Sequence, residues 1–235
     1  MNKLIVVTGG SKGIGRAIIE KFATHGFDVV TCARNGEELK KFKVYMNEKN
    51  PSAKVLTLPA DMTDREQVKS FINFVTELNR PVDVLVNNTG YFIPGSISTE
   101  PEGTLENMIQ ANLYSAYHTT RGLVQDMKDR KSGHIFNMCS IASIKAYSNG
   151  GSYAISKFAL LGFSKCLREE LKEFNIRVTS ILPGATQTSS WDESDLPEER
   201  FMRAEDIADT VYSAYAISGR SVVEEVIIRP QLGDI

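Results

Sequence analysis

The sequence predicts an α/β fold built around a parallel sheet. Short runs of strand length, apolar at residues 4–7 and apolar except for Asp83 at residues 82–86, lack the regular polar alternation of a half-exposed strand. This pattern is typical of parallel strands covered on both faces. Between these runs, apolar residues recur at helical spacing, so strand and helix alternate along the chain. Small or polar residues follow several of the runs. Because ligands bind outside the carboxyl ends of parallel strands, this pattern also predicts a binding site at that edge.

The composition of the 235 residues is that of a globular protein with a sizeable core, since 42% are hydrophobic and 24% are charged. No internal repeat and no long linker divides the chain, so we expect residues 1–235 to form a single domain. The net charge of −2 argues against the clustered basic residues of a nucleic-acid-binding protein. We therefore expect no nucleic-acid partner.

The three cysteines, Cys32, Cys139 and Cys166, have neither the spacing of metal ligands nor the even count of a disulfide framework. We therefore predict no metal site, and free thiols fit a reducing compartment. The apolar run at residues 4–7 is too short for the core of a signal peptide and far too short to span a bilayer. These features predict a cytoplasmic protein with no membrane partner.

The first predicted strand, residues 4–7, leads into a glycine-rich loop at residues 8–15. A helix is expected next, because the following apolar residues recur at helical spacing: Ile14, Ala17, Ile18 and Phe22. In such a unit, glycines let the backbone approach a pyrophosphate, which the helix N-terminus then binds. The spacing of Gly9, Gly13 and Gly15 is G-x-x-x-G-x-G rather than the usual G-x-G-x-x-G fingerprint. A glycine-rich turn without a ligand is the alternative.

The second predicted strand, residues 28–32, ends where the adenosine ribose of a dinucleotide would lie. An NAD site would carry Asp or Glu at this point, but this chain has Arg34, and Lys12 lies in the glycine loop. Two cations suit a 2′-phosphate, Arg through a bidentate fork and Lys as a point charge. The sequence therefore favours NADP(H). The alternative is that both cations are solvated surface charges.

The alternation of strands and helices continues to the C-terminus. Further strands are expected at residues 54–58, 82–86, 134–138, 176–182 and 225–228, with helices near residues 39–46, 68–78, 101–128, 153–174 and 207–215. Small and polar residues follow four of these strands and are candidates for ligand binding: Asp61 and Met62, residues 87–90, Ser140, and residues 183–188. Asn112 lies in the middle of the long predicted helix, where Asn is unfavourable.

Two predicted loops are candidates for a substrate site. Residues 91–95 are aromatic and form either a wall of a substrate cleft or a cover over the edge of the core. Residues 189–203 are acidic, break the periodicity and contain the only tryptophan, Trp191. Because a loop of this length is uncommon inside a compact domain and is often a lid or binding segment, we expect a substrate-loop insertion there.

Tyr153 and Lys157 lie four residues apart in a predicted helix, which brings them to one face. A free phenol has a pKa of about 10 and exchanges protons poorly at neutral pH. A nearby ammonium stabilises the phenolate and lowers that pKa, so the pair could serve as a general acid and base. The same spacing often occurs by chance. The alternative is an aromatic ring packed under a solvated helix.

In their order along the chain, these motifs resemble the classical short-chain dehydrogenase/reductase family. Residues 8–15 look like its T-G-x-x-x-G-x-G cofactor loop, and Asp61 resembles its adenine-contacting acid. Residues 87–90 resemble its N-N-A-G element, with Thr89 in place of the usual alanine. Four residues fall where the family keeps its catalytic tetrad: Asn112, Ser140, Tyr153 and Lys157. Three more match its P-G-x-x-x-T nicotinamide-contacting turn: Pro183, Gly184 and Thr188.

The resemblance implies a Rossmann-like, doubly wound, seven-stranded parallel sheet, an NADP(H) cofactor, and a homodimer or homotetramer. The cofactor contacts expected on these motifs are Thr8, Gly9, Ser11, Lys12, Gly13, Ile14, Gly15, Arg34, Asp61, Met62, Asn88, Gly90, Tyr153, Lys157, Pro183, Gly184 and Thr188. The expected substrate contacts are Ser140, Tyr153 and Trp191.

The activity implied by the resemblance is reduction of a ketone or aldehyde with hydride from NADPH. Tyr153 would donate the proton and Ser140 would hold the substrate carbonyl. Lys157 would lower the phenol pKa and bind ribose hydroxyls, and Asn112 would hold a water that links Lys157 to solvent. Trp191 and the C-terminal residues 222–235 also look like the bacterial sepiapterin reductase branch.

Other substrates and another class of function remain open. A 3-oxoacyl thioester, a sugar or a small diketone would suit the same fold, which does not choose among them. A protein of a different class, a non-catalytic NADP(H)-binding sensor, could use the same fold without turnover. Such relatives usually lose the tyrosine or the lysine of the tetrad, and this chain retains both.

Overall fold

The computed structural model describes residues 2–188, 191 and 194–235. The strands it describes form one seven-stranded parallel sheet, in the order β3-β2-β1-β4-β5-β6-β7. They are β1 (Lys3–Thr8), β2 (Phe27–Ala33), β3 (Val55–Pro59), β4 (Val84–Asn87), β5 (Gly133–Met138), β6 (Ile176–Pro183) and β7 (Glu225–Ile228). The chain starts at the centre of the sheet, runs out to β3 and returns to β4, so the strand order reverses between β1 and β4. Doubly wound sheets bind ligands at such a switch point.

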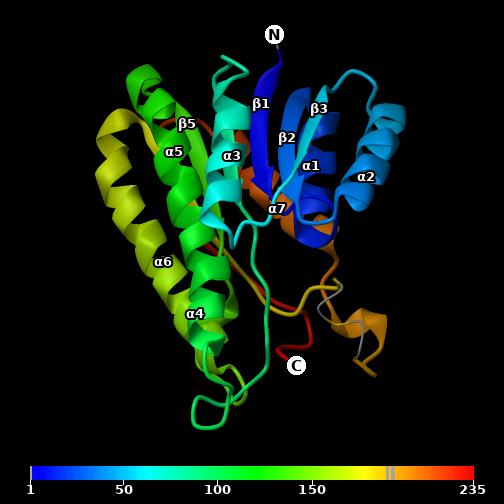
Figure 1. Cartoon of the computed structure of the whole chain (residues 1–235), viewed down its shortest axis with the longest axis vertical. Coiled ribbons are helices and arrows are strands. Elements are labelled where there is room, and N and C mark those ends of the chain that lie inside the picture. The colour runs from blue at the N-terminus through cyan, green and yellow to red at the C-terminus, as the bar shows by residue number, and fades with distance from the viewer. Residues whose placement is uncertain (1, 189–190, 192–193) are drawn as a thin grey trace.

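Helices cover both faces of the sheet (Figure 1). They are α1 (Gly13–Thr24), α2 (Gly36–Lys49), α3 (Arg65–Thr76), α4 (Thr104–Ile109), α5 (Ser115–Arg130), α6 (Gly151–Leu171) and α7 (Ala204–Ala216). Helices α1, α2 and α7 pack on one face, and α3, α5 and α6 pack on the other. No helix in the described part of the chain is long and apolar enough to cross a membrane.

Strand β1 is apolar from Leu4 to Val7 because both of its faces are buried there. Ile5 and Val7 belong to the core on the side of α1, α2 and α7, and Leu4 and Val6 belong to the core on the opposite side. Successive side chains of a strand point to opposite faces, so helices on both faces leave no position for a polar residue. The fold class expected from the sequence is confirmed.

The pairing register brings the carboxyl ends of the central strands to one edge of the sheet. Val7 of β1 pairs with Val86 of β4. One residue further along β4, Asn87 pairs with Asn137 of β5. Strand β6 extends three residues past Ser180, the partner of Asn137, and ends at Pro183 opposite Ile228 of β7. The small and polar segments that follow these strands in the sequence therefore meet at that edge.

The long helix expected at residues 101–128 is present, but it contains a wider turn. It runs as α4, a π-helical turn at Gln110–Tyr114, and α5. Asn112 lies within the π-helical turn and is fully buried. Such turns are rare and are frequently found at functional sites. The π-helical turn thus contains Asn112, the residue with poor helix propensity in the predicted helix.

The segment from β6 to α7 folds back on itself. Thr186 and Met202 form an isolated parallel bridge, and Glu198–Arg200 form a short 3-10 turn. The indole of Trp191 contacts the ring of Phe201, with centroids 5.2 Å apart. The substrate loop predicted at residues 189–203 is described only in part, because residues 189, 190, 192 and 193 lie outside the described residues.

Candidate active site

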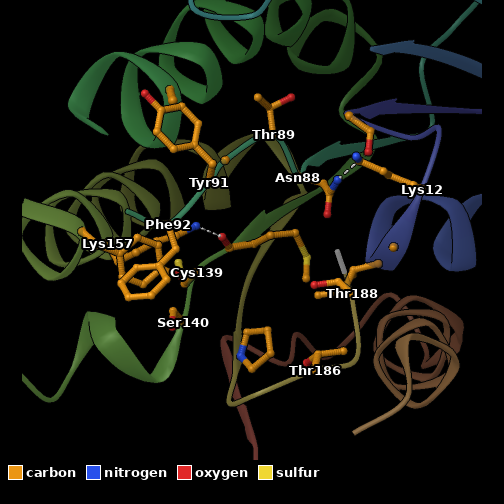
Figure 2. A pocket seen from close by; sticks show the side chains of 18 of the residues that line it. Lys12, Asn88, Thr89, Tyr91, Phe92, Cys139, Ser140, Lys157, Thr186 and Thr188 are labelled. Atoms are coloured by element: carbon orange, nitrogen blue, oxygen red, sulfur yellow. Dashed lines mark hydrogen bonds between the residues drawn. The ribbon is translucent and has the colours of Figure 1, made fainter. Parts of the chain in front are cut away.

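A cavity of about 660 Å³ extends along the carboxyl ends of the strands. It is lined by most of the residues predicted to bind cofactor or substrate: Gly9, Ser11, Lys12, Gly13, Ile14, Arg34, Asp61, Met62, Asn88, Gly90, Ser140, Tyr153, Lys157, Pro183, Gly184, Thr188 and Trp191. Thr8, Gly15 and Asn112 lie behind this lining. Figure 2 shows Lys12, Asn88 and Thr188 on one side of the pocket and Phe92, Lys157 and Ser140 on the other. The structure thus brings together residues that are far apart in the sequence.

The glycine loop has a backbone that other residues would not adopt easily. Gly9 and Gly13 have φ angles of +70° and +56°, in the left-handed region that favours glycine. Gly15 has no room for a side chain, because an added Cβ would lie 2.5 Å from both the Gly9 carbonyl oxygen and the Asn88 amide nitrogen. These glycines leave the backbone of the loop open to a ligand.

Thr8 and Asn88 hold this loop against β4. The Thr8 hydroxyl accepts hydrogen bonds from the backbone N–H groups of Asn88 and Thr89, both at 3.1 Å. The Asn88 side-chain amide donates to the carbonyl oxygens of Thr8 at 3.0 Å and Gly9 at 2.9 Å. Thr8 therefore bridges the two strands at the switch point, whereas the side chain of Asn88 also faces the cavity.

The two predicted phosphate-binding cations line the same cavity. Lys12 follows Ser11 in the glycine loop, and Arg34 follows β2. Within the described residues neither forms an ion pair, in contrast to Arg16, which pairs with Glu20 at 2.7 Å. A cation without a carboxylate partner is available for an anion from solution. These two positions therefore suit a phosphate group.

Tyr153 and Lys157 extend from the first two turns of α6 toward the end of β5. The Lys157 Nζ donates to the Met138 carbonyl oxygen at 2.8 Å and lies 5.7 Å from the centroid of the Tyr153 ring. Ser140 follows β5, and its hydroxyl accepts a hydrogen bond from the Ala142 backbone N–H at 3.1 Å. A phenol, a hydroxyl and an ammonium thus share one end of the cavity.

Burial controls the protonation of this group. It raises the pKa of Tyr153 above its ordinary value of 10.0, and a hydrogen bond with the Ser140 hydroxyl opposes the shift. It also lowers the pKa of Lys157 to about 8. The sequence led us to expect that Lys157 would lower the phenol pKa, but Lys157 donates to Met138 and burial dominates at Tyr153. At neutral pH the phenol is protonated, which is the form that a general acid needs.

Asn112 uses its side chain to fix the loop that follows β4. Its Oδ1 accepts from the Tyr91 backbone N–H at 2.9 Å, and its Nδ2 donates to the Tyr91 carbonyl oxygen at 3.1 Å. Nδ2 also donates to the Ser156 hydroxyl at 2.9 Å, on α6. These bonds compensate for the poor helix propensity of Asn112 and join the π-helical turn, the loop and α6. Its expected role in holding a water stays a prediction.

The family is decided by comparison with known proteins. Residues 3–199 match the family model of the short chain dehydrogenases. The chain belongs to the short-chain dehydrogenase family. The resemblance stated from the sequence motifs is thereby confirmed, and the protein is placed among the oxidoreductases.

Individual relatives extend over the whole chain. A sepiapterin reductase from Chlorobaculum tepidum is 34% identical over 243 aligned residues, covering 100% of this chain and 99% of the relative. Among solved structures, an alcohol dehydrogenase from the archaeon Thermococcus sibiricus complexed with 5-hydroxy-NADP has a TM-score of 0.92 at 25% identity, covering 99% and 98% of the two chains. L-sorbose reductase from Gluconobacter frateurii, complexed with NADPH and L-sorbose, has a TM-score of 0.90 at 27% identity, covering 97% and 95%.

The residues of this short-chain dehydrogenase fit a phosphorylated dinucleotide. The cavity volume of about 660 Å³ is in the range of cofactor sites, about 300–1,000 Å³. A Cβ at Gly13 would lie 3.2 Å from Thr188, so the loop approaches the segment after β6 closely. Lys12 and Arg34, which form no ion pair with the described residues, lie where a 2′-phosphate is expected. In the part of the chain that is described, no group of His, Cys, Asp and Glu side chains could hold a metal ion.

Sequence reasoning missed part of the cavity wall. Tyr147 lines the cavity, and burial together with the neighbouring Tyr153 phenol raises its pKa to about 12. Lys145, Asp234 and Ile235 line it as well. Tyr147 and Lys145 lie in the loop between β5 and α6, directly before the Tyr153 helix, and that position was a usable signal. Nothing in the sequence marks the C-terminal pair as cavity residues.

Aromatic rings form part of the cavity wall. The Phe92 ring meets the Tyr153 ring edge-to-face, with centroids 4.9 Å apart. Tyr147 and Trp191 also line the cavity. Phe92 comes from the aromatic loop at residues 91–95, which therefore forms a wall of this pocket. Such a lining suits a flat or apolar substrate.

Proposed function

We propose that this short-chain dehydrogenase is an NADPH-dependent carbonyl reductase. The observation that carries the proposal is that Tyr153, Ser140 and Lys157 share one continuous cavity with the cations Lys12 and Arg34. A proton donor and a site for a phosphorylated dinucleotide therefore open into the same space. NADP(H) is the cofactor that this arrangement and the NADP-bound relatives support.

In the reaction, bound NADPH would supply the hydride. The Tyr153 phenol donates its proton to the substrate carbonyl oxygen as negative charge develops there. The Ser140 hydroxyl holds that oxygen and stabilises the developing charge. Lys157 binds ribose hydroxyls and favours the phenolate that remains, and Asn112 holds the water through which the lysine exchanges protons with solvent.

For the substrate, the pterin side-chain ketone of sepiapterin is the best-supported candidate. The support is the 34% identity to a sepiapterin reductase over the whole chain, together with the aromatic lining from Phe92, Tyr147 and Trp191. A flat heterocycle stacks well on such rings. A 3-oxoacyl thioester and a small diketone are the competing substrates, and a sensor without turnover is the competing function.

A substrate panel tests both levels of the proposal. NADPH absorbance is followed with sepiapterin, an acetoacetyl thioester, a sugar ketone and simple diketones. We expect turnover that is fastest with sepiapterin. Preference for another carbonyl would overturn the substrate assignment alone, whereas tight NADPH binding without oxidation by any carbonyl would support the sensor.

For the organisation of the protein, we infer that residues 1–235 act as one NADP(H)-binding unit with a substrate loop at about residues 189–203. We also infer a cytoplasmic homodimer or homotetramer, as is common in this family. Light scattering of the purified protein tests the assembly, and a monomer at micromolar concentration would contradict it.

A further inference from the structure

Glu100 reaches from the loop after β4 to the first turn of α6. Its carboxylate accepts a hydrogen bond from the Ser152 hydroxyl and lies 3.5 Å from the Ser152 backbone nitrogen. Ser152 is only 1% exposed, so its hydroxyl is shielded from water and depends on this partner. Glu100 is therefore a partly buried carboxylate with a defined contact rather than a solvated surface charge.

The carboxylate caps the start of α6 in place of an N-cap side chain. The residue before the helix is Gly150, which offers no side-chain acceptor to the free N–H groups of the first turn. A negative charge near a helix N-terminus is favourable because it meets the positive end of the helix dipole. Tyr153 is the third residue of α6. The turn that Glu100 caps is therefore the turn that carries the proton donor.

Glycines make this close approach of loop and helix possible. Gly95 and Gly150 form an isolated parallel bridge, in which the Gly95 N–H donates to the Asn149 carbonyl oxygen at 3.0 Å. A Cβ at Gly151 would lie 2.5 Å from the Gly95 carbonyl oxygen and 3.0 Å from the Glu100 Oε2. The loop backbone and the start of the helix are thus in direct contact.

The loop that Glu100 fastens also carries Phe92. The Phe92 ring packs edge-to-face on the Tyr153 ring, at a centroid distance of 4.9 Å. Besides the Gly95 backbone contact, residues 91–100 therefore hold α6 through two side chains, Phe92 on the phenol ring and Glu100 on the first turn. Release of either side chain would loosen the position of the phenol.

We propose that Glu100 is a positioning residue for Tyr153. It clamps the first turn of α6 to the loop at residues 91–100 and so fixes the phenol relative to the cavity. The role rests on the proposed function, in which Tyr153 donates the proton. Glu100 lies outside the described cavity lining and acts through Ser152 and the helix. Because rates are sensitive to misplacement of about 1 Å, release of the clamp should lower turnover more than binding.

The test uses Glu100→Ala, Glu100→Gln, Ser152→Ala and the double variant Glu100→Ala/Ser152→Ala. Glu102→Ala, at an exposed acid two residues along the same loop, is the matched control. The measurements are kcat and KM with the best carbonyl, and the Kd for NADPH by fluorescence.

We expect Glu100→Ala to lower kcat about 10- to 100-fold while the Kd for NADPH stays within about twofold. Glu100→Gln should recover part of the loss, because its amide oxygen still accepts from Ser152. The double variant should be no worse than Glu100→Ala, since both changes remove one contact. A kcat for Glu100→Ala within twofold of the Glu102→Ala control, or additive single effects, would overturn the proposal.

Hydrogen exchange separates failure of the clamp from failure of the proposed function. The backbone amides of residues 151–157 should exchange faster in Glu100→Ala than in Glu102→Ala. If the wild-type protein reduces no carbonyl, the proposed function fails and the positioning role falls with it. If the wild-type protein is active but exchange in residues 151–157 is equal in the two variants, the clamp alone is overturned.

Discussion

The ammonium of Lys157 donates a hydrogen bond to the carbonyl oxygen of Met138, with 2.8 Å between Nζ and O. The bond ties α6 to the last residue of β5, two positions before Ser140. Burial lowers the pKa of Lys157 to about 8, so at pH 7 the protein holds a charge in its interior at a cost in stability. In the proposed function, the fixed cation beside Tyr153 serves the reaction at a cost in the stability of the fold.

Lys157→Met should abolish turnover and stabilise the protein. The folded pKa of about 8 lies below the ordinary value of 10.5, so protonation favours the unfolded chain. At pH 7 removal of the charge should raise the free energy of unfolding by roughly 1–3 kcal/mol, reduced by loss of the bond to Met138. Urea unfolding measures this change.

The effect of Lys157 on the free energy of unfolding should depend on pH. Between pH 8 and pH 10.5 the unfolded chain binds more protons than the folded one, so wild-type stability from this group rises with pH. The advantage of Lys157→Met should shrink across this window and vanish above it. Lys41→Met, at an exposed lysine on α2, is the matched control. If the Lys157→Met protein were less stable than the wild type at pH 7, this would contradict the view that the buried Lys157 charge destabilises the fold.

The double variant Lys12→Ala/Arg34→Ala should weaken the binding of NADPH far more than the binding of NADH. Each charge-assisted bond to the 2′-phosphate contributes about 1.5–3 kcal/mol, so the pair should raise the Kd for NADPH by at least about 30-fold. The Kd for NADH should change less than about threefold. Fluorescence titration measures both, with the exposed Lys69→Ala as control. Equal weakening of the two cofactors would disprove the 2′-phosphate site.

Gly15→Ala should damage the glycine loop, whereas Gly162→Ala should not. The new Cβ at Gly15 would lie 2.5 Å from the Gly9 carbonyl oxygen, so the loop must shift. We expect this shift to lower the free energy of unfolding by about 1–3 kcal/mol and the affinity for NADPH by at least about tenfold. A Cβ at Gly162, in the middle of α6, meets nothing within 4 Å and should stabilise the helix by about 0.5–1 kcal/mol. Thermal unfolding with and without NADPH distinguishes the two. If the Gly15→Ala protein bound NADPH as tightly as the wild type, the proposal that this loop binds the cofactor would be wrong.

His134 should make the protein sensitive to acid. It is fully buried in β5, stacks on Phe136 with ring centroids 3.9 Å apart, and shares a hydrogen bond with Thr179 at 2.8 Å. Burial, helped by the nearby Arg177, lowers its pKa from 6.5 to about 2. As the pH falls from 6.5 toward 2, only the unfolded chain gains a proton here, so folded stability is lost.

The His134→Phe variant should resist this loss. By pH 5 the wild-type protein should have lost about 2 kcal/mol through this group that the variant keeps. Chemical unfolding at pH 7 and pH 5 measures the difference between the two proteins. Equal losses in both would show that His134 does not titrate on unfolding as described.

The fold was largely predictable because its signals are local. Uninterrupted apolar runs such as residues 4–7 are typical of strands covered on both faces. The glycines of residues 8–15 stand where the backbone is left-handed, at Gly9 and Gly13, or where no side chain fits, at Gly15. The sequence marked Asn112 only as unfavourable in a helix, and the structure places it in a π-helical turn that was not predicted.

The rest of the site depends on approaches between distant segments. Asp234 and Glu100 come near the cavity or the Tyr153 helix through loop conformations that no spacing rule encodes. The protonation of Tyr153 was likewise beyond the sequence, because the burial that raises its pKa is a property of the packed structure. A tyrosine and a lysine four residues apart in a helix are expected to lie close together, but the hydrogen-bond acceptor of the Lys157 ammonium is the Met138 carbonyl oxygen.

Single-turnover oxidation of NADPH by the Tyr153→Phe variant tests the central claim most directly. The change removes only the phenol oxygen and leaves the ring against Phe92, so the Kd for NADPH should stay within about twofold of wild type. If Tyr153 is the proton donor, the rate with a responsive carbonyl should fall at least about 100-fold. A rate close to that of the wild-type protein would contradict the assignment.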